Sequence, residues 1–246
     1  MLQCCGGERA GRQAAVMAVL TAGLLVPRAV GAASAEALQS WWQGCVEAGV
    51  RALGDCAGRR EQLALAQAQG RAERHEAELL LGKGTEPGPR YSDSEADPAG
   101  RPGRHAYYLG PLDGLDADLV LILEDGQPPR FDWLAMGSPS ALPLPGLPWP
   151  SANGRWLFVV GAAVDGATAS ITLVQKVGAR WSQQFRYQPP AGLHYSFLGW
   201  RSDAAAVRLA WRRGAAAACR PRSGQLQLRD GPYGWDFFPA PPTACR

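Results

Sequence analysis

The feature that most constrains this chain is the run from residue 155 to residue 229, where short apolar segments alternate with turn signals. The turns are marked by Asp165-Gly166, Gly178-Ala179, Pro189-Pro190-Ala191-Gly192, Ser202-Asp203 and Pro221-Arg222-Ser223-Gly224. Connections this short join antiparallel strands, because a parallel pair needs a crossover of about a dozen residues. The run therefore predicts an antiparallel meander that closes into a sandwich or a small barrel.

The strands of this run are expected to differ in how they are buried. Residues 156–160 are continuously apolar, which predicts a central strand covered on both faces. In residues 169–177 a period of two places Thr172 on a polar face, which predicts a half-buried strand. The cleanest alternation comes next, and it predicts that Arg208 and Arg212 are solvated.

The first 35 residues predict export. Two arginines precede an apolar segment at 14–26, and small residues follow it, which is the order of a secretory signal. Cleavage is expected after Ala32 or Ala35. Because the apolar segment is too short to span a bilayer, we expect a periplasmic or secreted protein with no stable membrane insertion after cleavage.

The charge of the chain does not favour a polyanionic partner. Removing residues 1–35 takes away three arginines and one glutamate, which lowers the formal net charge from +3 to +1. A nearly neutral protein gives no electrostatic argument for binding nucleic acid or an anionic membrane. We therefore expect no nucleic-acid partner.

Four cysteines remain after the export segment. They are Cys45, Cys56, Cys219 and Cys245. An even number in an exported protein predicts two disulfides. Three pairings are possible and the sequence leaves them open, although pairing of neighbours closes the shortest loops. A thiol metal site would need Cys-x-x-Cys spacing or a nearby histidine pair, and the sequence contains neither, so no metal is expected.

From residue 36 to residue 82 the apolar period changes to that of helices. A first apolar stripe stops at Gly54, and Asp55 is placed to cap a second helix, which predicts a helical hairpin over 36–82. Its polar side is expected to be a solvated surface, and the charged residues on it are Arg59, Arg60, Glu61, Arg71, Glu73, Arg74, Glu76 and Glu78.

Residues 83–246 are expected to form a linker followed by one β domain. Residues 83–104 are rich in glycine and proline and predict a linker or mobile loop, and residues 105–246 predict the antiparallel β domain. Residues 138–150 carry five prolines and cannot form a central strand. The expected fold class is α+β, mainly β, with the meander preceded by a short N-terminal helical hairpin.

Residues 45–81 resemble the helical module of LprI-type lysozyme inhibitors. In that module an early cysteine, a spacer and a Cys-Ala pair lead into a second helix, and here these are Cys45 and Cys56-Ala57 followed by residues 60–81. The Leu-Asn pair of that family's second helix is absent. The resemblance implies a disulfide between Cys45 and Cys56 and, for function, an inhibitor.

The sequence contains no familiar catalytic motif. It has neither a Gly-x-Ser-x-Gly elbow nor a Gly-x-Gly-x-x-Gly phosphate loop, and its three histidines are widely separated. Asp113, Asp116 and Asp118 could supply calcium ligands, but turn chemistry explains Asp113 without an ion. We expect no cofactor.

Aromatic residues near the C-terminus are the candidate contacts for a ligand. Tyr233, Trp235 and Phe237 lie among glycines and prolines, and Trp149 is a fourth candidate. Such rings could stack on sugars or receive a protein partner, or they could belong to a closing segment folded onto the sheet.

The leading hypothesis is an exported, non-catalytic binding protein of the bacterial envelope that binds or inhibits another envelope protein. The alternatives are a carbohydrate- or peptidoglycan-binding module that uses these aromatic rings, and a hydrolase whose carboxylates come from separate loops.

Overall fold

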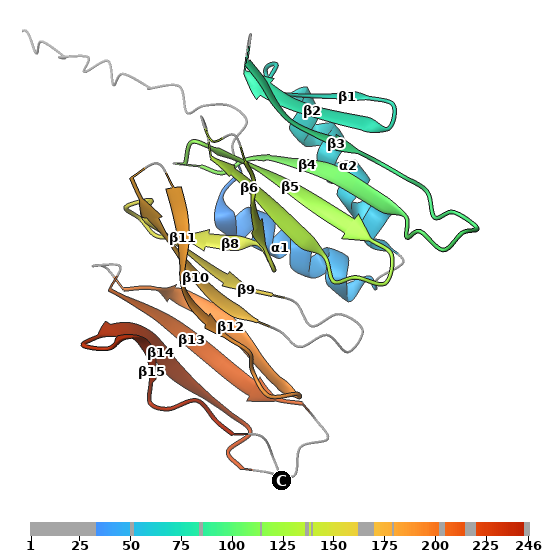
Figure 1. The fold of residues 1–246 in the computed structure, drawn as a ribbon. Helices are drawn as coiled ribbons and strands as arrows, with labels where there is room; N and C mark the ends of the chain where they lie inside the picture. The colour runs from blue at the N-terminus through green and yellow to red at the C-terminus, as the bar shows by residue number, and fades with distance from the viewer. Residues whose placement is uncertain are drawn as a thin grey trace, which may run out of the picture. The chain divides into compact units, whose positions relative to one another are not determined.

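The structure is a computed structural model, and it describes residues 33–49, 52–83, 86–113, 115–135, 138, 140–161, 170–178, 180–201, 205–214 and 220–243. These residues form two helices and fifteen strands in four antiparallel sheets (Figure 1). The predicted export segment before Ala33 lies outside them, and so do Cys219 and Cys245.

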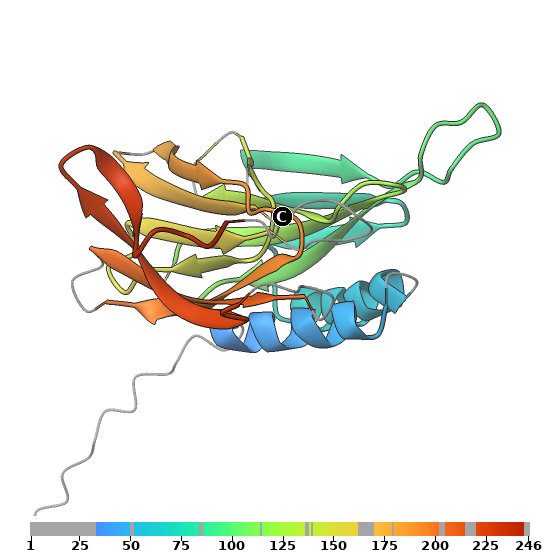
Figure 2. The ribbon, with the colours of Figure 1, turned by 90° about the horizontal axis from the view of Figure 1, so that it is seen from below.

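The N-terminal helical pair is confirmed. Helix α1 (Ala35–Glu47) begins after Ser34, whose Oγ accepts a hydrogen bond from the backbone N of Ala37 at 3.1 Å. Helix α2 (Leu53–Ala66) lies beside it (Figure 2), and a disulfide joins Cys45 to Cys56 with their Cα atoms 5.9 Å apart. One of the possible cysteine pairings is therefore present, the same one that the resemblance implies.

The predicted extension of the second helix to residue 82 is wrong. The predicted linker or mobile loop over 83–104 is wrong in its first part, where residues 86–92 form a strand, whereas residues 93–103 contain no helix or strand. Helix α2 ends at Ala66, and a three-stranded sheet follows, formed by β1 (Ala72–His75), β2 (Glu78–Lys83) and β3 (Glu86–Ser92). Gly70 has a φ of +76°, which interrupts a helical path. In β3, Gly88 passes so close to the carbonyl of Leu81 that a side chain there would collide with it. Glycine and proline thus mark an edge strand here.

The remaining twelve strands form three sheets of four, and each sheet takes its strands in chain order. They are β4 (Arg104–Pro111), β5 (Ala117–Glu124), β6 (Arg130–Ala135), β7 (Leu142–Leu144), β8 (Pro148–Pro150), β9 (Trp156–Val160), β10 (Ile171–Val177), β11 (Arg180–Tyr187), β12 (Leu193–Trp200), β13 (Ala206–Arg213), β14 (Ser223–Gly231) and β15 (Gly234–Phe238). The mainly-β α+β class and the antiparallel meander are confirmed. The sheets of the described residues are open, with two edge strands each, so they match the sandwich alternative and not the closed small barrel.

Alternate residues of the middle strands contribute to different hydrophobic cores. In β5, Val120 packs with β1, β2 and α2, while its neighbour Leu121 packs with α1 and with β9. In β9, Leu157 joins the same core as Leu121, while Phe158 packs against β12 and β13. Because neighbouring side chains of a strand point to opposite faces, both faces of these middle strands are covered. Residues 156–160 therefore form the covered central strand that was predicted. The edge strand β11, in contrast, exposes most of its residues.

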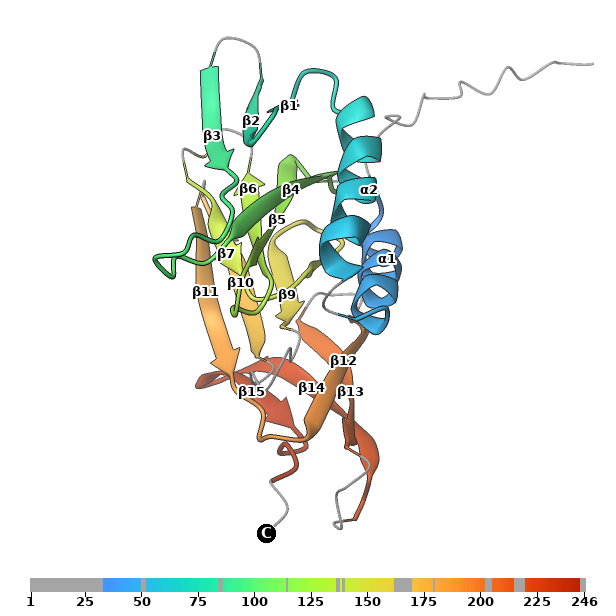
Figure 3. The same cartoon turned by 90° about the vertical axis from the view of Figure 1, so that its right-hand side faces the viewer.

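The prediction for Thr172 is wrong, whereas the prediction for residues 138–150 is confirmed. Thr172, predicted on a polar face, is buried, because β10 lies between two cores and Val174 on the same face packs with the α1 core. The proline-rich residues 138–150 contain β7 and β8, each at the edge of its sheet, as the proline content requires. Figure 3 shows α1 and α2 on one side of the sheets, where α2 packs along β4.

Candidate binding surface

The structure places the four predicted contact residues in different surroundings. Phe237 is buried and packs edge-on against Tyr187, with ring centroids 4.9 Å apart. Trp235 is half-buried against Trp156, and Trp149 is half-buried and stacked on Phe197 at 4.5 Å. All three belong to the core between β8–β11 and β12–β15. Only Tyr233, at the tip of the β14–β15 hairpin, is fully exposed, so these residues do not form an exposed aromatic row.

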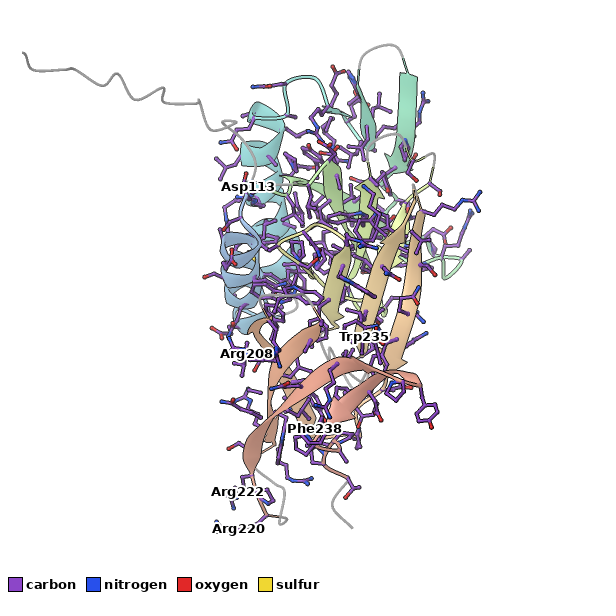
Figure 4. The ribbon with its side chains drawn as sticks, turned by 90° about the vertical axis from the view of Figure 1, so that its left-hand side faces the viewer. Asp113, Arg208, Arg220, Arg222, Trp235 and Phe238 are labelled. Carbon is purple, nitrogen blue, oxygen red and sulfur yellow. A yellow bond between two sulfur atoms is a disulfide. The ribbon has the colours of Figure 1, made fainter. Side chains whose placement is uncertain are left out.

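A different set of side chains gathers on the outer face of the sheet β12–β15. Alternation places Phe237 and Trp211 on the inner face and directs the residues between them outward. We call this outward set the arginine face, and its members are His194, Ser196, Leu198, Arg208, Ala210, Arg212, Gln225, Gln227, Arg229, Asp236 and Phe238. Arg220 and Arg222 lie next to it, just before β14, and Figure 4 labels both together with Arg208 and Phe238.

Strand register sets the spacing of the three arginines within this face. Arg212 and Arg208 are four residues apart on β13, which corresponds to about 13 Å along a strand. Arg208 pairs with Gln227 of β14, and Arg229 is two residues further on, a diagonal neighbour at roughly 7–8 Å. The backbone positions of the three arginines therefore span about 20 Å, most of it along β13. Their side chains spread sideways from this line, since Arg208 reaches over Gly199 of β12 and Arg229 lies over Phe238 of β15.

A β-bulge in β12 shapes the surroundings of Arg208. Phe197 pairs with Leu209 and Gly199 with Arg208, so Leu198 is the extra residue. Gly199 has a φ of +142°, and a Cβ at that position would lie 3.2 Å from Nη2 of Arg208. Glycine thus provides both the backbone conformation and the space in which the Arg208 side chain lies across β12.

The arginines of this face lack ionic partners within the described part of the chain. The side chains of Arg208, Arg212, Arg220, Arg222 and Arg229 form no ion pair and no hydrogen bond there, whereas the five arginine–carboxylate ion pairs of the described residues lie between residues 61 and 132. Asp236 is opposite Arg229 in the register, but its Oδ1 accepts a hydrogen bond from the backbone N of Phe237 at 2.7 Å. Guanidinium groups without carboxylates are available to an anionic ligand.

Arg229 and Arg213 contact other groups of this sheet and of the segments beside it. The guanidinium of Arg229 lies over the ring of Phe238 at 3.9 Å from its centroid, and more than half of Phe238 remains exposed. Arg213 has a different role, since its Nε and Nη1 donate to the carbonyls of Pro221 and Thr243 at 3.1 and 2.9 Å. It fastens the segments before β14 and after β15 to the sheet.

Acidic and basic residues are unevenly distributed along the chain, and the net charge of the whole chain does not show this. Residues 33–147, with both helices and the first two sheets, contain 10 basic and 17 acidic residues, a formal charge of −7. Residues 148–246, with the last two sheets, contain 12 basic and 4 acidic residues, a formal charge of +8. The nearly neutral net charge therefore combines an acidic part, residues 33–147, and a basic part, residues 148–246. Counting the charges of each part separately would have identified the basic part from the sequence.

Buried charges occur in the acidic part, and the prediction that its helical polar side is wholly solvated is wrong. Arg74 donates to Glu61 at 2.6 Å, to Asp93 at 3.0 Å and to the carbonyl of Ala106. Glu61 also accepts from the backbone N of Tyr108 at 2.9 Å. These contacts tie α2 and β1 to β4, and no single-sequence pattern shows them because the partners come from separate elements.

A second buried group lies close by. Arg71 donates to Asp118 at 3.0 Å, and the hydroxyl of Tyr108 donates to the other oxygen of Asp118 at 2.8 Å. Asp132 is likewise held by Arg130 at 3.1 Å. The three buried carboxylates, Glu61, Asp118 and Asp132, thus each have an arginine counter-ion. A general acid needs a carboxyl that is free to exchange a proton with a substrate, so these contacts favour a structural role.

Among the residues that the structure describes, no group of three or more histidines, cysteines or carboxylates is placed to hold a metal ion. None of the helices in those ranges has the length and apolar character needed to cross a bilayer. Comparisons with protein-family models, with curated proteins and with solved structures give no match for this chain.

Proposed function

We propose that this chain is an exported binding protein that holds another component of the bacterial envelope on its arginine face. The observation that carries the proposal is the set of five arginines on and beside one exposed sheet face, none of them with a carboxylate partner in the described part. Like charges on neighbouring strands repel one another, so a protein gains no stability from such a face. A ligand that neutralises these charges accounts for it.

The fold supports recognition through this face. Strands β5, β6 and β9 have both faces covered by cores, whereas alternate residues of β12–β15 form one exposed face. A four-stranded antiparallel sheet holds the backbone positions of these residues in a fixed register, so binding requires ordering of the side chains but no rearrangement of the sheet.

Export is tested by the mass of the protein after expression of the full chain in bacteria. The expected result is a periplasmic or secreted species that lacks residues 1–32 or 1–35. A protein that stays in the cytoplasm at full mass would contradict the export part of the proposal.

Binding is tested by sedimentation with envelope fragments from the bacterium that encodes the protein. We expect the wild-type protein to sediment with the fragments and the R208Q/R212Q/R229Q variant to stay in solution. The matched control R59Q/R90Q/R186Q removes the same charge from exposed arginines elsewhere and should sediment like the wild type. Equal sedimentation of both variants, or none by the wild type, would overturn the proposal.

Inhibition of an envelope enzyme is the second candidate function. It rests on the resemblance of residues 45–81 to LprI-type lysozyme inhibitors and on the Cys45–Cys56 disulfide that this resemblance implies. The test is the rate of cell-wall lysis by lysozyme in the presence of the protein. A rate that does not fall at micromolar protein would remove this candidate.

A further inference from the structure

We propose that the ligand of the arginine face is a linear polysaccharide that carries carboxylates along its length. This inference rests on the proposed function and names the chemical class of the component that is bound. Three features of the face support it: its charge, the path of its arginines, and the uncharged groups between them.

The charge of the face selects an anionic ligand. Arg208, Arg212 and Arg229 lie on the face itself, Arg220 and Arg222 extend the positive charge beyond Ser223, and Asp236 is the single carboxylate among the face residues. The planar fork of a guanidinium matches the two oxygens of a carboxylate.

The path of the arginines selects an extended ligand. The backbone positions of Arg212, Arg208 and Arg229 span about 20 Å along β13 and β14, longer than a single sugar or a small organic acid can cover. A chain with repeated carboxylates can bind all three groups at once and gains from multivalency. The acidic residues 33–147 repel such a polymer, which confines it to the last two sheets.

The groups between the arginines favour a saccharide over an acidic protein. Gln225 and Gln227 offer amides, and Ser196 and Ser223 offer hydroxyl groups, all of which can bond to sugar hydroxyls. A protein partner would require an apolar centre, yet Leu198 is the only large aliphatic residue of the face. The exposed rings of Phe238 and Tyr233, at the β15 side, can pack against the apolar face of a sugar ring.

The inference is tested by titrating the full-chain protein, purified as the cell produces it, with polygalacturonate. Neutral dextran, poly-L-glutamate and single-stranded DNA are titrated in parallel. We expect polygalacturonate to bind with an affinity that falls steeply as salt is raised, dextran not to bind, and the other two polyanions to bind at least about tenfold more weakly. Binding of poly-L-glutamate or DNA as tight as that of polygalacturonate would overturn the choice of a polysaccharide.

Variants locate the site. R208Q/R212Q/R229Q should lose at least about tenfold in affinity for polygalacturonate, while R59Q/R90Q/R186Q should keep it within about twofold. The charge-preserving R208K/R212K/R229K keeps the ammonium charge but not the fork, so it should lose affinity by a smaller factor. Circular dichroism confirms that each variant is folded. Unchanged affinity of the glutamine variant would place the polymer elsewhere and overturn the inference.

The outcome separates this inference from the proposed function. If the wild-type protein sediments with envelope fragments through its arginine face but does not bind polygalacturonate, the proposed function stands and the carboxylate-bearing polysaccharide is refuted. If it does neither, both are refuted.

Discussion

Replacement of Arg74 by methionine should destabilise the protein more than any exposed substitution in the acidic part. The Arg74 side chain is 18% exposed, and its partners Glu61 and Asp93 are 10% and 19% exposed. Methionine fills a similar volume but leaves both carboxylates and the carbonyl of Ala106 without their donor. Breaking a buried ion pair from one side costs about 3–5 kcal/mol. Since whole domains are stable by about 5–15 kcal/mol, this one change should remove a large part of the stability.

Urea unfolding followed by tryptophan fluorescence measures this loss. The control R59M changes an exposed arginine of α2 and should alter the free energy of unfolding by no more than about 0.5 kcal/mol. The double variant R74M/E61L should cost at least about 1 kcal/mol less than the sum of the two single changes, because it removes both charges of one pair. If R74M costs no more than R59M, or if the two changes are additive, the ion pair does not join α2 to β1.

Two further predictions test the assignment of core and surface. F237A should cost about 3–5 kcal/mol, because Phe237 is buried between the last two sheets, whereas Y233A at the exposed hairpin tip should change stability by no more than about 0.5 kcal/mol; similar urea midpoints for both variants would contradict this. Burial raises the pKa of Tyr91, Tyr108 and Tyr195 above the usual value, and Asp132, Asp118 and Tyr187 respectively raise it further. The folded state therefore favours the neutral phenols, so stability should be independent of these groups below pH 10 and should fall above it by about 1.4 kcal/mol per pH unit for each tyrosine. Urea unfolding between pH 9 and pH 11, with tyrosinate absorbance, measures this, and a flat profile would show that the phenols ionise freely.

The strands could be predicted from sequence because their signals are local. Residues 156–160 are apolar without interruption, which correctly predicted that β9 is buried on both faces. Arg208 and Arg212 alternate with apolar residues, which correctly predicted that β13 is buried on one face. The division of the meander into separate sheets could not be predicted in this way. A period of two shows that a segment is a strand, but it does not show where one sheet ends and the next begins.

The region from 67 to 92 shows why a weak helical pattern misleads. Leu79 and Leu80 fit the end of a helical stripe, yet they lie in β2, where Leu79 and Leu81 face the core. The decisive determinants are long-range, because β2 packs on β4 and β5 and Arg74 of β1 reaches Glu61 of α2. A single sequence contains no periodic signal for contacts between elements that are so far apart.

In the candidate site, too, the sequence shows single residues but does not show which residues strand pairing brings together. The sequence singles out the aromatic residues Trp149, Trp235 and Phe237, but all three pack in a hydrophobic core. Large rings favour such positions because they bury more apolar area than any other side chain. The solvated arginines on β13 were predicted individually. Their significance depends on Arg229 of β14, which strand pairing brings beside Arg208, and on the absence of carboxylates around them in the described part.

Stacking of the sheets explains why recognition should be concentrated at one end of the chain. A strand enclosed by two cores exposes only its ends, and β5, β6 and β9 are enclosed in this way. Exposed positions are found instead on β11 and on the outer faces of β1–β3 and β12–β15. The outer face of β1–β3 bears Glu73 and His75, which form a hydrogen bond at 3.2 Å. On the outer face of β12–β15, Arg208, Arg212 and Arg229 have no carboxylate partner in the described part. If the arginine-to-glutamine variant of this face behaved like wild type in every binding assay, the link between the stacked architecture and recognition would be broken.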